Sequence, residues 1–129
     1  KEYPILNQSS QLAAKATLAA DRQGKYIEFH DALVGAAEIN ESLIESISKQ
    51  VGVNYETLKK DMNDEKINGY LSSNYGLANA LNIQGTPAYI VGTQVIPGAI
   101  DLDSLKKIVA QEKAKLLIPS NVAASSMAQ

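Results

Sequence analysis

The junction Gly85-Thr86-Pro87-Ala88 is the feature that most constrains the fold of this chain. The residues before it follow helical spacing, whereas the residues after it carry the clear strand pattern of the sequence. Proline has no backbone N–H and a fixed φ, so it suits the first residue of a strand and holds Thr86 in an extended conformation. The sequence therefore predicts that helices give way to strands at this point.

Five helices are predicted before the junction. The first is expected to follow an N-cap at Ser9 or Ser10, and its buried stripe consists mainly of alanine, which favours close approach between helices. Asn40 and Asn54 are expected to cap the third and fourth helices, and the fifth is expected over about residues 64–81. Most of the chain before Gly85 is thus predicted to be helical.

A β-hairpin and one more helix are predicted after the junction. Residues 88–91 are apolar and rich in strand formers, Gly92-Thr93 fits a two-residue turn, and residues 94–96 form the returning strand. Asp101 is expected to cap the last helix, whose buried side is predicted to carry Leu102, Leu105, Ile108 and Val109.

Composition limits the functions that this chain can have. It has 129 residues, a net charge of −2 and no apolar run near the roughly 20 residues that span a bilayer, so we expect no nucleic-acid partner and no membrane span. It has no cysteine, which excludes thiol chemistry within the chain. The single histidine, His30, is expected to have a packing or helix-surface role, and we expect no metal ion and no cofactor.

The hairpin needs further strands or a covering helix, because a two-stranded sheet is marginally stable alone. The helical block is therefore predicted to be an insertion between two parts of a larger sheet, with residues 1–5 as the strand that precedes it. The opening Lys1-Glu2-Tyr3-Pro4 shows no signal-peptide pattern, and we expect this chain to be a fragment.

This layout and several motifs resemble the DsbA-like branch of the thioredoxin superfamily, in particular its bacterial disulfide oxidoreductases. The resemblance extends from residue 1 to about residue 117 and rests on segments in the family's order and spacing: Lys1-Glu2-Tyr3-Pro4-Ile5, Ser9-Ser10, Ala13-Ala14, Ala19-Ala20, Gly24-Lys25-Tyr26, Glu28-Phe29-His30-Asp31-Ala32-Leu33, Ile83, Gly85-Thr86-Pro87-Ala88 and Pro97-Gly98-Ala99.

The resemblance implies an α/β thioredoxin-like fold with an inserted helical domain. The N-terminal β-α-β part of that fold is absent here, so the chain is expected to be mostly helical. Residues 1–6 would be the end of a thioredoxin-domain strand, and residues 7–82 the inserted helical domain. Residues 83–117 would form the C-terminal thioredoxin part, and residues 118–129 a flexible tail.

The resemblance also implies a substrate-binding site formed by Gly85, Thr86 and Pro87. Pro87 would be the cis-proline of the family, and the backbone of Thr86 would pair with an extended substrate segment by strand addition. The family's Cys-x-x-Cys lies upstream of the matching region, so this chain contains no catalytic residue and cannot exchange disulfides as given.

Two functions remain open at this point. The preferred one is the C-terminal part of a periplasmic thiol:disulfide oxidoreductase, whose partners are unfolded protein substrates and a redox partner protein. The alternative is a redox-inactive, chaperone-like module that binds extended peptides. The strand expected between residues 1–5 and 88–91 is missing, so we also expect self-association, element swapping or retention of a cleaved N-terminal segment.

Overall fold

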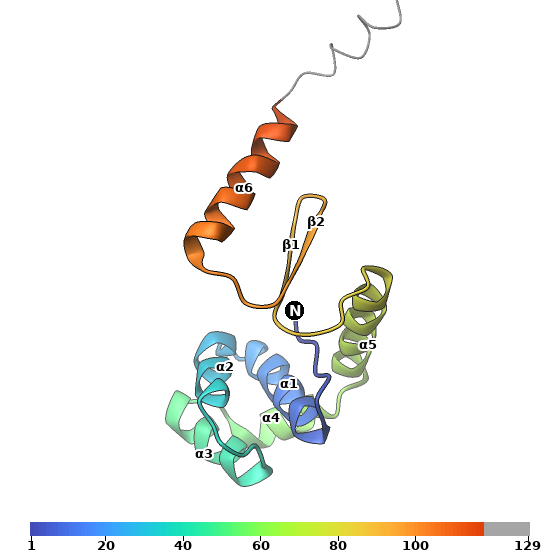
Figure 1. Cartoon of the computed structure of the whole chain (residues 1–129). Coiled ribbons are helices and arrows are strands. Elements are labelled where there is room, and N and C mark those ends of the chain that lie inside the picture. Colours follow the sequence, from blue (N-terminus) through green and yellow to red (C-terminus); the bar gives the residue numbers. More distant parts are fainter. Residues whose placement is uncertain (118–129) are drawn as a thin grey trace, which may run out of the picture. The chain divides into compact units, whose positions relative to one another are not determined.

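The computed structural model describes residues 1–117, which form six helices and one two-stranded antiparallel sheet (Figure 1). The chain divides into two compact units, one over residues 1–80 and one that begins at Leu81. This mostly helical content with a single hairpin agrees with the predicted fold class, whereas the predicted tail lies outside the described residues. None of the helices within residues 1–117 has the length and apolar character needed to cross a membrane.

Five helices build the first unit: α1 (Gln8–Asp21), α2 (Tyr26–Val34), α3 (Glu41–Val51), α4 (Tyr55–Met62) and α5 (Glu65–Ala80). The predicted caps Asn40 and Asn54 are confirmed, because each side chain accepts a hydrogen bond from the backbone N–H three residues later. The predicted cap of α1 is wrong. Asn7 accepts from the Ser10 N–H at 3.1 Å instead, which places Ser9 inside the helix.

The core of the first unit is arranged around α1. Its buried face carries the alanines Ala14, Ala16, Ala19 and Ala20, each at most 2% exposed, and the helix contacts α2, α4 and α5. Because alanine adds only a methyl group, these neighbours can approach α1 closely. The bulky side chains come from the other helices, with Phe29, Ile44 and Leu58 completely enclosed.

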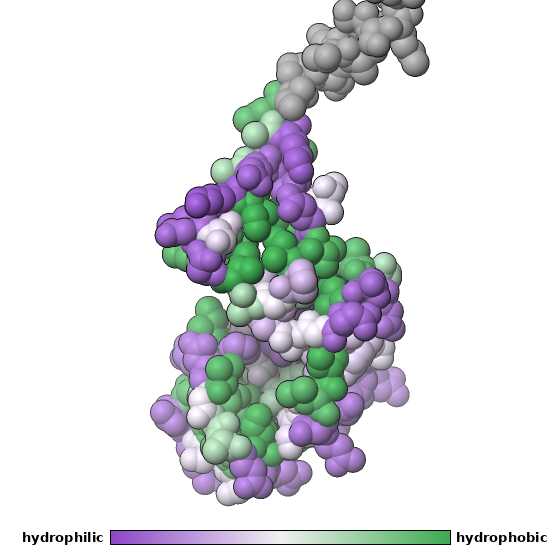
Figure 2. All heavy atoms as spheres, viewed as in Figure 1, coloured by the Kyte–Doolittle hydropathy of each residue, from purple (hydrophilic) through white to green (hydrophobic). Residues whose placement is uncertain are grey.

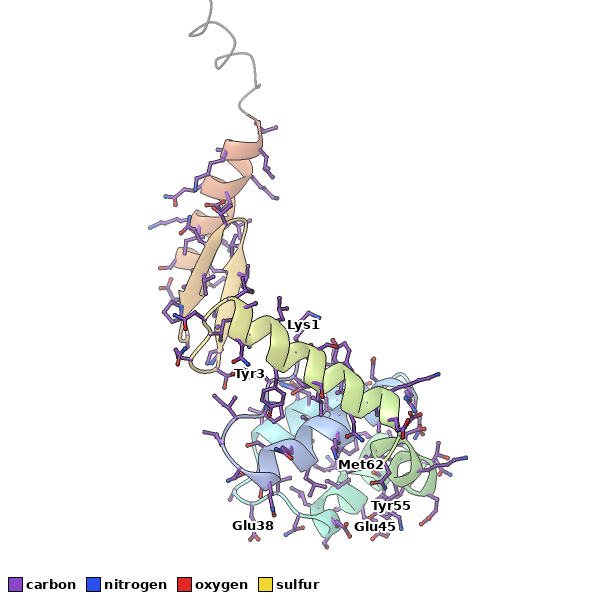
Figure 3. All side chains as sticks on the ribbon, turned by 90° about the vertical axis from the view of Figure 1, so that its right-hand side faces the viewer. Lys1, Tyr3, Glu38, Glu45, Tyr55 and Met62 are labelled. Carbon is purple, nitrogen blue, oxygen red and sulfur yellow. The ribbon has the colours of Figure 1, made fainter. Side chains whose placement is uncertain are left out.

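The segment before α1 packs on α5 (Figure 3). The buried Asn74 side chain donates to the Glu2 carbonyl at 2.8 Å, and the Tyr75 hydroxyl donates to the Pro4 carbonyl. Tyr3 lies edge-on against the Tyr75 ring, with the ring centres 5.1 Å apart. The first six residues contain no strand in the structure, and their assignment to a thioredoxin-domain strand stays a prediction.

The second unit contains β1 (Ala88–Val91), β2 (Gln94–Pro97) and α6 (Leu102–Leu116). The strands pair in the register Ala88 with Pro97 and Val91 with Gln94, which leaves Gly92-Thr93 as the predicted turn. Helix α6 contacts β1 and begins after the predicted cap Asp101, whose side chain accepts from the Ser104 N–H at 2.9 Å. The predicted burial of Leu102 is wrong: it lies in the first turn of α6 and is 64% exposed.

Candidate functional site

The three predicted site residues form one loop directly before β1. Thr86 and Pro87 are exposed, Gly85 is half-buried, and the Thr86–Pro87 peptide bond is cis. The Pro87 carbonyl accepts a hydrogen bond from the Gly98 N–H at 2.9 Å, which continues the strand pairing by one residue beyond β1. The loop is therefore attached to the base of the hairpin.

The backbone of Thr86 is available to a ligand. Among residues 1–117, neither its N–H nor its C=O forms a hydrogen bond with the protein. Exposed backbone groups of this kind can pair with an added extended chain. The loop thus has one free donor and one free acceptor, and the role of Gly85, Thr86 and Pro87 in substrate binding stays a prediction.

The two edges of the hairpin differ. Antiparallel pairs alternate between bonded and non-bonded positions, and the bond from Gly98 to Pro87 fixes this alternation. Ala88 and Ile90 of β1 therefore direct their N–H and C=O groups away from β2. On β2 the outward positions are Val95 and Pro97, and proline has no N–H to donate. The edge of β1, which continues from the loop, has the larger capacity to pair.

The hairpin has an open apolar face next to this edge. Ile90 and Val95 are paired across the strands, and they are 48% and 41% exposed. Figure 2 shows hydrophobic side chains gathered over the hairpin. Residues 81–100 contain no charged residue, so this surface has neither a cation nor an anion to select a charged ligand. It suits apolar side chains.

The sequence analysis did not identify Glu112, the one buried acidic residue among the described residues. Its carboxylate accepts hydrogen bonds from the Gln94 side chain at 2.6 Å, from the Thr93 N–H at 3.4 Å and from the Lys115 ammonium. The bonds from Lys115 and Gln94 hold the pKa of Glu112 below its ordinary value. Its position seven residues after Leu105, on the apolar stripe of α6, was the available indication.

The first unit has a cavity of about 560 Å³ with Leu18, Ile67 and charged residues of both signs in its wall. The Glu2 carboxylate at this cavity accepts from the Tyr26 hydroxyl at 2.5 Å, and burial together with this bond raises the pKa of Tyr26. The mixed charges do not select one kind of ion. Within the described part of the chain, no cluster of three or more histidine, cysteine or acidic side chains could hold a metal ion.

Comparison with solved structures finds thioredoxin-like relatives. A thioredoxin-like oxidoreductase from Silicibacter pomeroyi DSS-3 is 35% identical, with a TM-score of 0.83 over 88% of this chain and 66% of that chain. The thiol-disulfide exchange protein alpha-DsbA2 from Wolbachia pipientis is 32% identical, with a TM-score of 0.77 over 85% and 62%. A periplasmic thioredoxin-like protein from Salmonella enterica serovar Typhimurium is 31% identical, with a TM-score of 0.74 over 88% and 64%.

The chain spans 62–66% of the length of these relatives. No curated protein sequence matches it. The family model of the DSBA-like thioredoxin domain matches residues 2–110, which is most of the chain. The match covers the helical unit, the Gly85–Pro87 loop, the hairpin and the first half of α6. The chain therefore belongs to the family of DSBA-like thioredoxin domains, and its fold is thioredoxin-like.

Proposed function

We propose that this chain is the substrate-binding C-terminal part of a DsbA-like thiol:disulfide oxidoreductase of the bacterial envelope. The observation that carries the proposal is the exposed loop before β1, in which the Thr86 backbone is unpaired among the described residues. An extended substrate segment would accept a hydrogen bond from the Thr86 N–H and donate one to the Thr86 C=O. The open apolar face at Ile90 and Val95 would receive neighbouring apolar side chains of the same segment.

The chain by itself is redox-inactive in this proposal, because it contains no cysteine. Thiol–disulfide exchange requires an attacking thiolate. We place the Cys-x-x-Cys in a segment outside these residues, and the partial coverage of the relatives supports this placement. The loop would then hold a substrate cysteine beside that dithiol. The periplasmic relative from Salmonella supports an envelope location.

Peptide binding tests the proposal on the chain as it is. Thr86→Pro removes the free N–H, whereas Thr86→Ala removes only the side chain. We expect Thr86→Pro to raise the Kd for an unfolded apolar peptide about tenfold, as loss of a backbone hydrogen bond implies, and Thr86→Ala to change it less than about threefold. Fluorescence anisotropy with a labelled peptide measures both constants. Equal affinities of Thr86→Pro and the parent chain would contradict binding through this loop.

The absence of cysteine also favours a second function, a redox-inactive module that binds extended peptides as a chaperone does. The gene upstream of the Lys1 codon separates the two. A Cys-x-x-Cys there, together with insulin reduction by the whole protein, supports the oxidoreductase. Insulin reduction at the background rate leaves peptide binding as the function.

We further propose that the chain by itself associates through the β1 edge, because Ala88 and Ile90 direct backbone groups outward there. Ile90→Pro removes one outward N–H from this edge, and Val95→Pro removes one outward N–H from the opposite edge, on β2. Light scattering should show dimers for Val95→Pro and monomers for Ile90→Pro. A monomeric parent chain would refute the association.

A further inference from the structure

The hairpin turn is held by a buried carboxylate of α6. Glu112 is 6% exposed and accepts hydrogen bonds from both turn-side residues, the Thr93 N–H at 3.4 Å and the Gln94 side chain at 2.6 Å. Lys115, one turn further along α6, donates to the same carboxylate from the solvent side. Both oxygens of the Glu112 carboxylate therefore accept a hydrogen bond, and these bonds offset the cost of burying its charge.

Gly92 makes this arrangement possible. Its φ is +58°, in the left-handed region that favours glycine. A Cβ at this position would also overlap the Glu112 carboxylate. Glycine therefore fits the backbone conformation of the turn, and it also leaves room for the Glu112 carboxylate, which a Cβ would displace.

The hairpin is attached to α6 at both of its ends. At the base, residues 98–101 form a short connection to the helix, and the Gly98 N–H donates to the Pro87 carbonyl. At the turn, Glu112 supplies the second attachment, and in Figure 1 α6 runs beside the hairpin from base to turn. About five residues, or about 16 Å, separate Pro87 from the turn. A hairpin held only at its base could rotate as one body about that base, and the loop, which is attached there, would rotate with it.

We propose that Glu112 is a positioning residue: it locks the hairpin turn onto α6 and so fixes the place from which the Gly85–Pro87 loop presents Thr86 to an extended segment. The ligand in this inference is the extended peptide of the proposed function. The effect of Glu112 on the position of the loop in the free protein does not depend on that function. Glu112 would act through the hairpin and would not touch the ligand.

The test compares Glu112→Ala with Glu112→Gln and with Gln111→Ala, the exposed neighbour on α6. In the free chain, we expect Glu112→Ala to speed amide exchange at Thr93 about tenfold, as loss of a charged hydrogen bond implies, and to shift the amide resonance of Thr86. The Kd for the apolar peptide should rise about threefold to tenfold. Glu112→Gln should show part of the parent's behaviour in each measurement, because its amide oxygen still accepts from Thr93. Gln111→Ala should change none of the three quantities.

A double-mutant cycle tests the contact between Gly92 and Glu112. The loss of stability caused by Gly92→Ala should be smaller in the Glu112→Ala background, because no carboxylate is then displaced. Additive effects would contradict this contact.

The outcomes also separate the positioning role from the proposed function. Fast exchange at Thr93 in Glu112→Ala with an unchanged Thr86 resonance would overturn the positioning role. Glu112 would then stabilise the turn without affecting the loop. If the parent chain binds no peptide, the proposed function fails, and the Thr86 resonance in the free protein still decides the role of Glu112.

Discussion

Gly52 shows how a single residue directs the chain into the core. It follows α3 with φ +78°, and its N–H donates to the Ser48 carbonyl. The Val53 N–H donates to the same carbonyl at 2.8 Å. This pair of bonds ends the helix and turns the chain, which brings Val53, at 6% exposure, into the hydrophobic core.

Two glycine substitutions in the same unit should therefore have opposite effects. Gly52→Ala forces a Cβ into the left-handed region and should lower the free energy of unfolding by about 1 kcal/mol. Gly76 lies inside α5 and is exposed, and a Cβ added there would meet no other atom within 4 Å. Gly76→Ala should therefore raise that free energy by about 0.5–1 kcal/mol. Urea denaturation followed by circular dichroism measures both, and changes of the same sign would contradict the assigned backbone conformations.

At the scale of the elements, local patterns predicted much of what the structure contains. Asn40 and Asn54 identified two helix starts because an N-cap bond spans only three residues. The Asn7 cap was missed because Ser9 and Ser10 are equally good caps by residue type, and only the backbone geometry distinguishes them. Gly92-Thr93 identified the turn.

The Glu112 contact could not be predicted in the same way. It joins residues 18 and 19 positions apart, and it exists only because α6 packs along the hairpin. In the predicted site, too, the sequence indicated one part and the tertiary packing determined the other. The sequence motif placed Gly85, Thr86 and Pro87 in one loop, but the exposure and the unpaired backbone of Thr86 depend on the packing of the unit around them.

The attachment of the hairpin to α6 should weaken in acid. Hydrogen bonds from Lys115 and Gln94 favour the charged form of Glu112 and hold its pKa below the ordinary 4.5. Because this pKa is lower in the folded than in the unfolded chain, the stabilisation is complete above about pH 4.5 and is lost as the pH falls through the folded value.

The ¹³C resonance of the Glu112 carboxyl group gives this pKa directly, and the Thr93 amide resonance should follow the same titration. Glu112→Gln serves as the control, since it has no proton to bind and the Thr93 resonance should then lose this transition. A Glu112 pKa at or above 4.5 would contradict the bonds that the structure shows.

At the scale of the whole molecule, the hydrophobic core is distributed unevenly. Every buried hydrophobic residue among residues 1–117 lies before Leu81. In the second unit the apolar side chains of the hairpin are half-buried or exposed, and within residues 81–117 the buried residue is Glu112. Burial of apolar surface is the main source of stability, so the hairpin and α6 should open at lower free energy than the helical unit.

Leu58→Ala tests this division, because Leu58 is completely enclosed in the first core. The substitution should lower the stability of the helical unit by about 2–5 kcal/mol. Leu77→Ala removes the same atoms from a side chain that is 41% exposed and should cost much less. Native-state amide exchange reports the two units separately. The amide at position 58 reports the helical unit, and the amide of Ile96 reports the second unit.

In the parent chain we expect Ile96 to exchange at least about tenfold faster than Leu58, which corresponds to about 1.4 kcal/mol of opening free energy. In Leu58→Ala, exchange should accelerate strongly at the substituted position and in α1, because these amides open with the first core. Ile96 should change little, since the contacts that hold β2 lie in the second unit. Equal acceleration at both positions would show that the two units unfold together, and the stability of the hairpin would then depend on the helical core.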